Sequence, residues 1–322
     1  MTRIAIGDAR EMLRLVGNES IHSCVTSPPY WLLRKYNAGP GEIGREPTVQ
    51  GYVANLMQVI DEIHRVLRPD GTFWLNLADT YVKKSACLVP YRVAVAMADR
   101  GWIVRNVIIW HKPDGKPESV RDRFTVDYEP LLFCTKSPCY YFQQQLRPYS
   151  PKTLKRCQIY IQNGEAFDPA RHKVDQSRPA QAPAIVRGRI AKNLLVPGQT
   201  THGMHLARAN GHDQDIFNPA GARMRCVWSI PTARYRGAHF AVFPERLVQI
   251  CIEAGCPPGR TVLDPFLGSG TVAVVAERLG RNCLGIELNP EYAEQARERI
   301  LHARAKRSEQ LRSGGDRAVD LT

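Results

Sequence analysis

The sequence lacks several features that would place it in other classes of protein. It has no run of about 18 apolar residues, so it contains no candidate membrane-spanning helix. Its nine cysteines form no CxxC pair and have no regular spacing, which argues against a disulfide scaffold or a zinc module, and we expect no metal site. The first ten residues, MTRIAIGDAR, lack the apolar segment of a signal peptide. These absences predict a globular protein of the reducing cytoplasm.

Acidic residues are too few to balance the basic ones, and the formal net charge is +13. Residues 143–236 hold 15 Lys or Arg and five Asp or Glu, which accounts for ten of these thirteen charges. Charge alone suits a nucleic acid or an anionic membrane equally. Because aromatic residues are interspersed with the basic ones, we interpret the stretch as a loop-rich nucleic-acid-binding region. A solvated or partly disordered insertion is the alternative.

Outside that stretch, β-prone runs alternate with amphipathic ones. The apolar spacing predicts helices over 52–67, 88–100, 244–254, 271–279 and 290–300, and strands over 23–26, 72–77, 104–110, 128–134, 261–263 and 282–287. This alternation predicts an α/β protein with a doubly wound, mostly parallel, Rossmann-like sheet. The expected organisation is a core of residues 1–142 and 237–303, an inserted basic region of residues 143–236, and a disordered polar tail from 304 to 322.

A turn with two glycines follows the strand predicted at 261–263. Gly268 and Gly270 allow the backbone to approach a ligand closely, and Glu287, 19 residues after Gly268, can accept hydrogen bonds from the ribose hydroxyls of an adenosine-containing cofactor. Asp264 would repel a pyrophosphate but suits a cationic amino group. The third glycine of a dinucleotide motif is missing from Gly268-Ser-Gly-Thr-Val-Ala273. The pattern favours S-adenosylmethionine over NAD; an ordinary turn with a surface glutamate is the alternative.

The first predicted strand leads into Thr26-Ser-Pro-Pro-Tyr30. Two consecutive prolines fix φ twice and remove two N–H donors, which makes a stiff loop with unengaged carbonyls. Tyr30 can stack on a planar base, and the Ser27 hydroxyl and the Pro28 carbonyl can accept hydrogen bonds from an exocyclic amine. In isolation, such a segment is more often a rigid turn than a catalytic loop.

Both motifs together resemble those of the amino-methylating DNA methyltransferases, in the permuted group whose catalytic loop precedes the cofactor loop. That family's Asp/Asn/Ser-Pro-Pro-Tyr/Phe motif is matched by Ser27 to Tyr30, and its Asp-Pro-Phe-x-Gly-Ser-Gly-Thr motif by Asp264 to Thr271. The basic region occupies the place of the family's variable target-recognition domain. The resemblance implies a catalytic set and a cofactor-binding set: Ser27, Pro28, Pro29 and Tyr30 in the first, and Asp8, Thr26, Phe243, Asp264, Pro265, Phe266, Gly268, Ser269, Gly270, Thr271, Glu287, Leu288 and Asn289 in the second.

The reaction that the resemblance implies is methylation of an exocyclic amine in double-stranded DNA, after the base leaves the stack. No Pro-Cys motif of the kind used for cytosine C5 is present. In the family, Ser at the first motif position is typical of cytosine N4 methylation, so Ser27 favours N4, with adenine N6 as the alternative. More remote alternatives are a catalytically silent DNA-binding protein and an RNA or small-molecule methyltransferase. A homodimer and a separate cognate restriction endonuclease are possible partners.

Other residues carry weaker expectations. Residues 31–46 suit either a lid over the flipped base or a surface loop. Trp74 and Trp110 are expected in the core, and His111 is expected either to face the base pocket or to be a surface histidine with its hydrogen bonds satisfied. Lys112, Arg34 and Lys35 could contact DNA phosphates. Asp79 and Asp127 could lie near the cofactor or the base, but we interpret them as solvated loop acids.

Overall fold

The computed structural model describes residues 2–33, 42–115, 117–150, 222–233 and 243–314, with side chains in the last range as far as residue 307. The chain divides into two compact units, residues 1–143 with 225–322, and residues 144–224. Of the second unit the structure describes a short antiparallel pair, β8 (Leu146–Arg147) and β9 (Ala222–Arg223). Most of the predicted basic region, residues 151–221, lies outside the described residues, as do Arg34 and Lys35.

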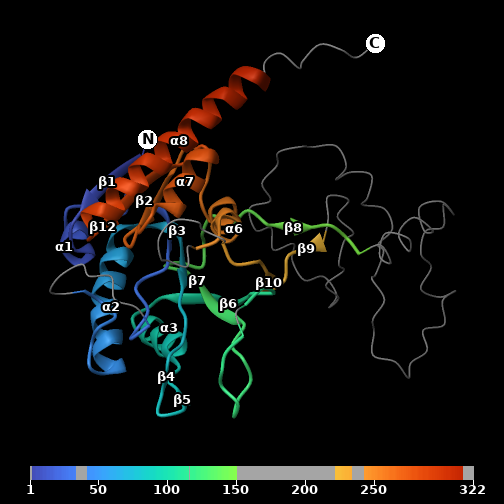
Figure 1. Cartoon of the computed structure of the whole chain (residues 1–322). Coiled ribbons are helices and arrows are strands. Elements are labelled where there is room, and N and C mark those ends of the chain that lie inside the picture. Colours follow the sequence, from blue (N-terminus) through green and yellow to red (C-terminus); the bar gives the residue numbers. More distant parts are fainter. Residues whose placement is uncertain (1, 34–41, 116, 151–221, 234–242, 315–322) are drawn as a thin grey trace, which may run out of the picture. The chain divides into compact units, whose positions relative to one another are not determined.

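The described part of the first unit is built on one eight-stranded sheet (Figure 1). Its order is β1-β12-β11-β2-β3-β7-β6-β10. Strand β7 runs antiparallel to both of its neighbours and the other pairs are parallel, which confirms the mostly parallel sheet. The strands are β1 (Thr2–Ile6), β2 (Ile21–Thr26), β3 (Leu67–Asn76), β6 (Ile103–His111), β7 (Tyr128–Thr135), β10 (Val227–Ser229), β11 (Thr261–Asp264) and β12 (Asn282–Glu287). A separate hairpin joins β4 (Tyr81–Val82) to β5 (Ser85–Ala86).

Helices cover both faces of the sheet (Figure 1). One layer holds α1 (Ala9–Arg14), α2 (Val49–Val66) and α3 (Val89–Asp99), and the other holds α6 (Glu245–Gly255), α7 (Thr271–Arg278) and α8 (Pro290–Gly314). Successive side chains of a strand point to opposite faces. Accordingly, Phe73 packs in the cluster with α2, while its neighbour Thr72 donates a 3.0 Å hydrogen bond to the Gly255 carbonyl of α6. The sheet is therefore doubly wound, as predicted.

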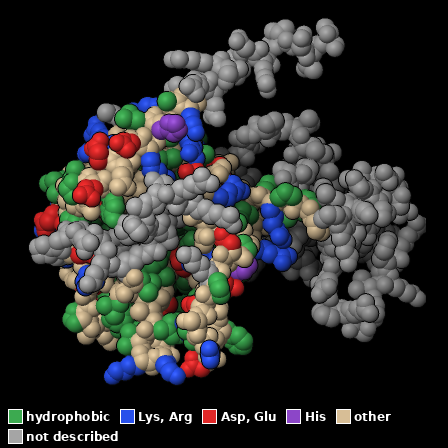
Figure 2. Space-filling view, in the orientation of Figure 1, with side chains coloured by type: hydrophobic (Ala, Val, Ile, Leu, Met, Phe, Trp, Pro, Cys, Tyr) green, Lys and Arg blue, Asp and Glu red, His purple; other side chains and the backbone are tan. Residues whose placement is uncertain are grey.

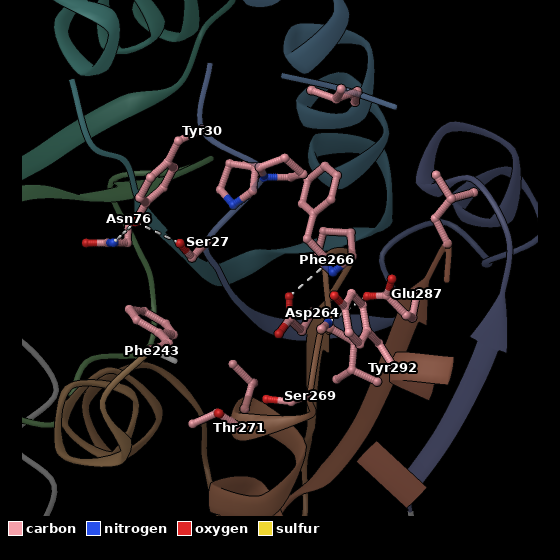
Figure 3. A pocket seen from close by; sticks show the side chains of 18 of the residues that line it. Ser27, Tyr30, Asn76, Phe243, Asp264, Phe266, Ser269, Thr271, Glu287 and Tyr292 are labelled. Carbon is pink, nitrogen blue, oxygen red and sulfur yellow. Dashed lines mark hydrogen bonds between the residues drawn. The ribbon is translucent and has the colours of Figure 1, made fainter. Parts of the chain in front are cut away.

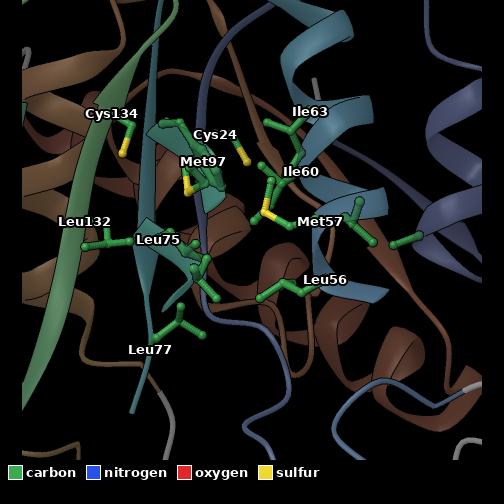
Figure 4. Close-up of a cluster of buried hydrophobic side chains, with 14 of the residues drawn as sticks. Cys24, Leu56, Met57, Ile60, Ile63, Leu75, Leu77, Met97, Leu132 and Cys134 are labelled. Atoms are coloured by element: carbon green, nitrogen blue, oxygen red, sulfur yellow. The ribbon is translucent and has the colours of Figure 1, made fainter. Parts of the chain in front are cut away.

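The core beneath the first layer shows why the sequence forms these elements (Figure 4). Buried side chains recur at Leu56, Ile60 and Ile63 of α2, a spacing that places them on one face of a helix. They pack on Cys24 and Leu75, which alternate with residues of the opposite face along β2 and β3. Burial of this apolar surface is the main force that holds the layer to the sheet.

Two predicted boundaries were wrong. Residues 304–314, assigned to a disordered tail, continue α8, because Glu277 of α7 accepts hydrogen bonds from Arg304 and its carbonyl accepts one from Arg307. Strand β10 lies within the range assigned to the basic region, yet it extends the central sheet by pairing with β6. Trp228 provides the reason, since its side chain is buried, as expected of a strand in the core rather than of a solvated loop.

The order of the strands creates a switch point between β2 and β11. From β2 the chain proceeds through α2 to β3 on one side, and from β11 it proceeds through α7 to β12 on the other. Open α/β sheets bind ligands at such a point, outside the carboxyl ends of the strands. Thr26 ends β2 and Asp264 ends β11, so both sequence motifs begin there.

Candidate active site

A cavity of about 490 Å³ opens at this switch point. Its lining includes the four residues of the predicted catalytic set and most of the predicted cofactor set. Figure 3 shows two groups of side chains, with Ser27, Tyr30 and Asn76 on one side and Phe266, Glu287 and Tyr292 on the other. Asp264 lies between the two groups in this view. The fold therefore brings the two motifs to one cavity, although they are more than 230 residues apart in sequence.

The catalytic loop is fixed from both of its ends. Thr26 is buried at the end of β2, and the Tyr52 hydroxyl of α2 donates a 2.9 Å hydrogen bond to the Pro29 carbonyl. Trp31 is buried beyond the motif and donates its indole N–H to the Glu46 carbonyl at 2.8 Å. The Pro28 carbonyl, which sequence reasoning assigned to the target amine, belongs to a residue that lines the cavity.

A polar network surrounds Tyr30. The Ser27 hydroxyl donates to the Tyr30 hydroxyl at 3.0 Å, and the Tyr30 hydroxyl donates to Glu129 Oε2 at 2.7 Å. Asn76 Nδ2 donates to both the Tyr30 oxygen and Glu129 Oε2 at 2.6 Å. Lys112 Nζ forms an ion pair with Glu129 Oε1. The Tyr30 side chain is thus held in place by its hydroxyl group while its ring borders the cavity.

Sequence reasoning missed Asn76 and Glu129 as site residues, and it left Lys112 without an assigned role. The sequence did contain a signal for Asn76 and Glu129. Asn76 interrupts the apolar run 73–77, and Glu129 lies close to the apolar run 131–134. A polar residue within a buried strand needs a partner. Glu129 is 8% exposed and Asn76 is 1% exposed. Trp110 is buried as expected, and it also lines the cavity, where Lys112 Nζ lies 4.8 Å from the centre of its ring.

The carboxyl group of Asp264 connects the cofactor loop to the catalytic strand. Its Oδ1 accepts hydrogen bonds from the Thr26 hydroxyl at 2.6 Å and from the Phe266 amide at 3.1 Å. Burial raises the pKa of Asp264 to about 7, in spite of the two hydrogen bonds, which act in the opposite direction. A cation placed beside this carboxyl would favour its charged form, so the site is suited to a positively charged ligand group.

Glu287 lies at the end of β12 with both oxygens turned to the loops of the cavity. Oε2 accepts from the Gly268 amide at 2.7 Å and Oε1 from the Asn289 amide at 2.8 Å. Burial raises the pKa of Glu287 above its usual value, against the effect of these amides. Each carboxylate oxygen has a further lone pair that can accept from a ligand hydroxyl. Leu288 and Tyr292 also line the cavity.

The two glycines of the cofactor loop have different surroundings. Both have positive φ, +53° at Gly268 and +83° at Gly270. A Cβ added to Gly270 would stand 2.7 Å from the Cβ of Ala296, whereas one added to Gly268 would meet no atom within 4 Å. Gly270 therefore allows α7 and α8 to pack, and Gly268 leaves space in the cavity that a side chain would fill.

Other predicted cofactor residues take various positions. Ser269 and Thr271 line the cavity, and Arg299 of α8 binds the loop by donating to the Ser269 carbonyl at 2.6 Å. Asp8 also lines the cavity, but its carboxylate is paired with Arg10 and begins α1 by accepting from the Arg10 amide at 2.8 Å. The Arg10 hydrogen bond lowers the pKa of Asp8. Phe243 of the predicted cofactor set, described together with Pro244 just before α6, also lines the cavity.

Asp79 and His111, which carried weaker expectations, lie outside the cavity lining. Asp79 is not simply a solvated acid, because its carboxylate accepts from the Leu88 and Val89 amides at 2.9 Å at the start of α3. His111 lies next to Ser229 of β10, with Nδ1 3.0 Å from the hydroxyl oxygen. Of the stretch 31–46, expected to be a lid or a surface loop, residues 34–41 lie outside the described residues.

These residues fit S-adenosylmethionine. Its ammonium and sulfonium groups are cationic and suit Asp264, and its ribose hydroxyls suit the free lone pairs of Glu287. The space beside Gly268 would be filled by a Cβ, and the aromatic rings of Phe266 and Tyr292 border the part of the cavity next to Glu287 (Figure 3). The cationic groups and the ribose hydroxyls of the ligand thus have side chains of matching chemistry in one cavity.

Comparisons with known proteins show the family to which the chain belongs. The family model described as DNA methylase, which covers N6 and N4 methyltransferases, matches residues 21–298. The chain belongs to this DNA methylase family. The type II methyltransferase M.SmaI of Serratia marcescens is 35% identical over 94% of this chain and 91% of its own length. M.SfiI of Streptomyces fimbriatus is 31% identical over 89% of this chain and 88% of its own length.

Solved structures support the fold of this DNA methylase. The PvuII DNA methyltransferase (cytosine-N4-specific) matches with a TM-score of 0.60 and 19% identity, over 95% of this chain and 92% of the other. A putative DNA modification methylase of Thermus thermophilus, in complex with S-adenosyl-L-methionine, matches with a TM-score of 0.56 and 23% identity, over 94% and 96% of the two chains. These two structures share the fold, while the family model and the type II relatives identify the DNA methylase as a DNA methyltransferase of the N4/N6 amino-methylating type, with S-adenosyl-L-methionine as its cofactor.

None of the helices described is long and apolar enough to cross a membrane. Among the residues that the structure describes, no group of three or more His, Cys, Asp and Glu is placed to hold a metal ion.

Proposed function

We propose that this DNA methylase methylates the N4 amine of cytosine in double-stranded DNA, after the base has left the helix and entered the cavity. The proposal rests chiefly on Ser27, whose hydroxyl hydrogen is directed to Tyr30. Since the hydroxyl oxygen has two lone pairs, Ser27 can accept a hydrogen bond from an amine at the same time. Bound S-adenosylmethionine supplies an electrophilic methyl group.

The residues of the chain would activate the amine. Its lone pair is delocalised into the ring, and hydrogen bonds from its two N–H groups to Ser27 Oγ and the Pro28 carbonyl draw the nitrogen toward tetrahedral geometry. The same two oxygens stabilise the positive charge that develops on nitrogen. The Tyr30 ring replaces the stacking that the flipped base loses, a loss of a few kcal/mol.

We assign the cofactor residues as follows. Asp264 binds the amino group of the methionine part, Glu287 binds the ribose hydroxyls, and the ring of Phe266 packs on the adenosine. Gly268, Ser269 and Thr271 complete the wall of the cavity. Asp8 has a smaller part than the sequence suggested, because Arg10 already neutralises its carboxylate.

DNA binding is assigned to the basic residues of the second unit, residues 144–224, which would contact phosphates, while a few polar side chains of the same unit would reach base edges and recognise the target. In Figure 2, by contrast, basic and acidic side chains are interspersed on the described face of the first unit. A homodimer and a separate cognate restriction endonuclease are part of the proposal. The relatives described above are type II methyltransferases.

Mass spectrometry of nucleosides tests the proposal. Unmethylated duplex DNA of diverse sequence, incubated with the protein and S-adenosylmethionine, should yield N4-methylcytosine. N6-methyladenine would contradict the assignment of the target base, and the absence of any methylated nucleoside would contradict the reaction itself. Ser27→Ala should lower methyl transfer by about 100-fold or more while cofactor binding persists; full activity in this variant would contradict the role of Ser27.

A further inference from the structure

The hydrogen bonds around Tyr30 form a continuous path from the catalytic loop into the interior. Ser27 Oγ lies 3.0 Å from the Tyr30 oxygen, which lies 2.7 Å from Glu129 Oε2. Both distances are within the range over which protons move between oxygen atoms. Ser27 and Tyr30 belong to the same loop, whereas Glu129 lies on β7, 99 residues after Tyr30, and has no part in the activation of the amine by Ser27 and Pro28.

The polarity of this path is fixed by Glu129. An ionised carboxylate has no hydrogen, so the Tyr30 hydroxyl must donate to it. Because Tyr30 has then used its one hydrogen, it can only accept from Ser27, and Ser27 must donate. All hydrogens along the path consequently point toward Glu129, which leaves a lone pair of Ser27 Oγ to accept from a substrate amine.

We propose that Ser27, Tyr30 and Glu129 form a proton-transfer chain that removes the proton lost by the target amine during methylation. This proposal rests on the proposed function of Ser27. When the new N–C bond forms, the nitrogen becomes positively charged and one of its N–H bonds must break. That proton passes to Ser27 Oγ as the Ser27 proton passes to the Tyr30 oxygen and the Tyr30 proton passes to Glu129 Oε2. Both hydroxyls end neutral, and Glu129 ends as a neutral acid.

Two further residues prepare Glu129 for this task. Lys112 forms an ion pair with Oε1, the oxygen that faces away from the path, and so holds the carboxyl group with Oε2 turned toward Tyr30. Asn76 donates to both Tyr30 and Glu129 from its Nδ2 and fixes their relative position. Asn76 Oδ1 is buried with no hydrogen-bond partner among the described residues. The amide therefore takes the orientation that directs Nδ2 to the Tyr30 oxygen and Glu129 Oε2, even though this leaves Oδ1 without a donor. Lys112 and Asn76 are therefore positioning residues.

The proton-transfer chain affects the rate of methylation if the proton begins to move while the N–C bond forms. Positive charge on an exocyclic amine is poorly stabilised because the ring withdraws electrons from it. A path that carries the charge away to a carboxylate lowers the energy of the same transition state, an effect typically worth 10²-fold to 10⁴-fold.

The test compares Tyr30→Phe, Glu129→Gln and the double variant in single-turnover methylation of duplex DNA, in H₂O and D₂O. Tyr30→Phe keeps the ring but removes the hydroxyl, and Glu129→Gln keeps the size but cannot take up a proton. Tyr91→Phe is the matched control, since Tyr91 is exposed on α3 and does not line the cavity. Calorimetric titration with S-adenosylmethionine verifies that each variant is folded.

Each single variant should be slower by about 100-fold or more, and the double variant no slower than the singles, because residues that act as one unit are not additive. The wild-type protein should show a solvent deuterium isotope effect that both variants lose. Any of three results would overturn the proton-transfer chain and leave the proposed function intact. These are a Tyr30→Phe rate equal to that of Tyr91→Phe, additive losses in the double variant, and a solvent isotope effect that persists in the slow variants. A wild-type protein that methylates no DNA would overturn both.

Discussion

Thr26 and Asp264, 238 residues apart in sequence, share a 2.6 Å hydrogen bond between the ends of two neighbouring strands. The bond joins the start of the catalytic loop to the start of the cofactor loop. It also connects the protonation of Asp264 to the geometry of both loops, because the Thr26 hydroxyl donates to the charged carboxylate.

The raised pKa of Asp264 predicts that cofactor binding depends on pH. With a pKa of about 7, the ionised fraction of this carboxyl grows roughly fivefold between pH 6 and pH 7. If the cofactor ammonium requires the ionised form, the affinity for S-adenosylmethionine should rise by the same factor in calorimetric titrations. Asp264→Asn should bind weakly at both pH values. Glu287→Gln serves as a comparison that weakens binding but keeps a pH dependence, displaced to lower pH because the charge of Glu287 helps to raise the pKa of Asp264. A flat response in the wild-type protein would contradict the role of Asp264.

Replacing Thr26 with Val should shift this pH dependence upward. The Thr26 hydrogen bond lowers the pKa of Asp264, so its removal leaves the effect of burial less opposed. Thr26→Val, which keeps the shape of the side chain, should bind S-adenosylmethionine more weakly than wild type at pH 7 and approach it at higher pH. Titrations at several pH values measure the midpoint. An unchanged midpoint would show that the hydrogen bond does not tune the carboxyl.

The two glycines of the cofactor loop should respond differently to alanine. Gly270→Ala places a methyl group 2.7 Å from Ala296 at a φ of +83°, so the free energy of unfolding should fall by about 2–4 kcal/mol. Gly268→Ala adds about 1–2 kcal/mol of backbone strain but meets open space, so its main effect should be weaker cofactor binding.

Chemical denaturation and calorimetric titration separate the two effects. Ala296→Gly in the Gly270→Ala background should restore part of the stability, since it removes the methyl group that clashes. If Gly268→Ala binds the cofactor as well as wild type does, the space beside Gly268 is not part of the cofactor site.

The end of α8 should contribute to stability. Glu277 is 8% exposed, and Arg304 donates to its carboxylate at 3.1 Å. A protein truncated after residue 303 loses this contact and the Arg307 hydrogen bond to the Glu277 carbonyl, and its free energy of unfolding should be about 1 kcal/mol lower, a modest value because Arg304 is partly exposed. A chain that stops after residue 314 is the control.

Acid should remove the part of this stability difference that comes from the ion pair of Arg304 with Glu277. The Arg304 hydrogen bond lowers the pKa of Glu277 in the folded protein, so the stabilisation is present above the ordinary glutamate pKa and is lost as the pH falls through the folded value. Thermal unfolding of the two chains from pH 7 to pH 3 measures the trend. Equal stability of the two chains at pH 7 would show that the Arg304 contact contributes nothing.

Much of the fold and both motifs could be predicted from sequence because their signals are local. The apolar spacing of α2 and the glycine turn after Asp264 each lie within a few consecutive residues. The polar network could not be predicted in this way. Asn76 ends β3, Glu129 lies on β7 and Lys112 directly follows β6, and the order of these three neighbouring strands is a tertiary property. The last turns of α8 were missed for a similar reason: their partner, Glu277, lies on another helix.

The strand order also has a consequence for synthesis on the ribosome. The first 143 residues contain the catalytic loop and five strands of the sheet, but β1 and β2 pair with β12 and β11, which are made last. A nascent chain therefore cannot complete the cavity until Glu287 has emerged, however early its first half folds. An unfinished or prematurely ended chain would carry the catalytic loop without a place for the methyl donor.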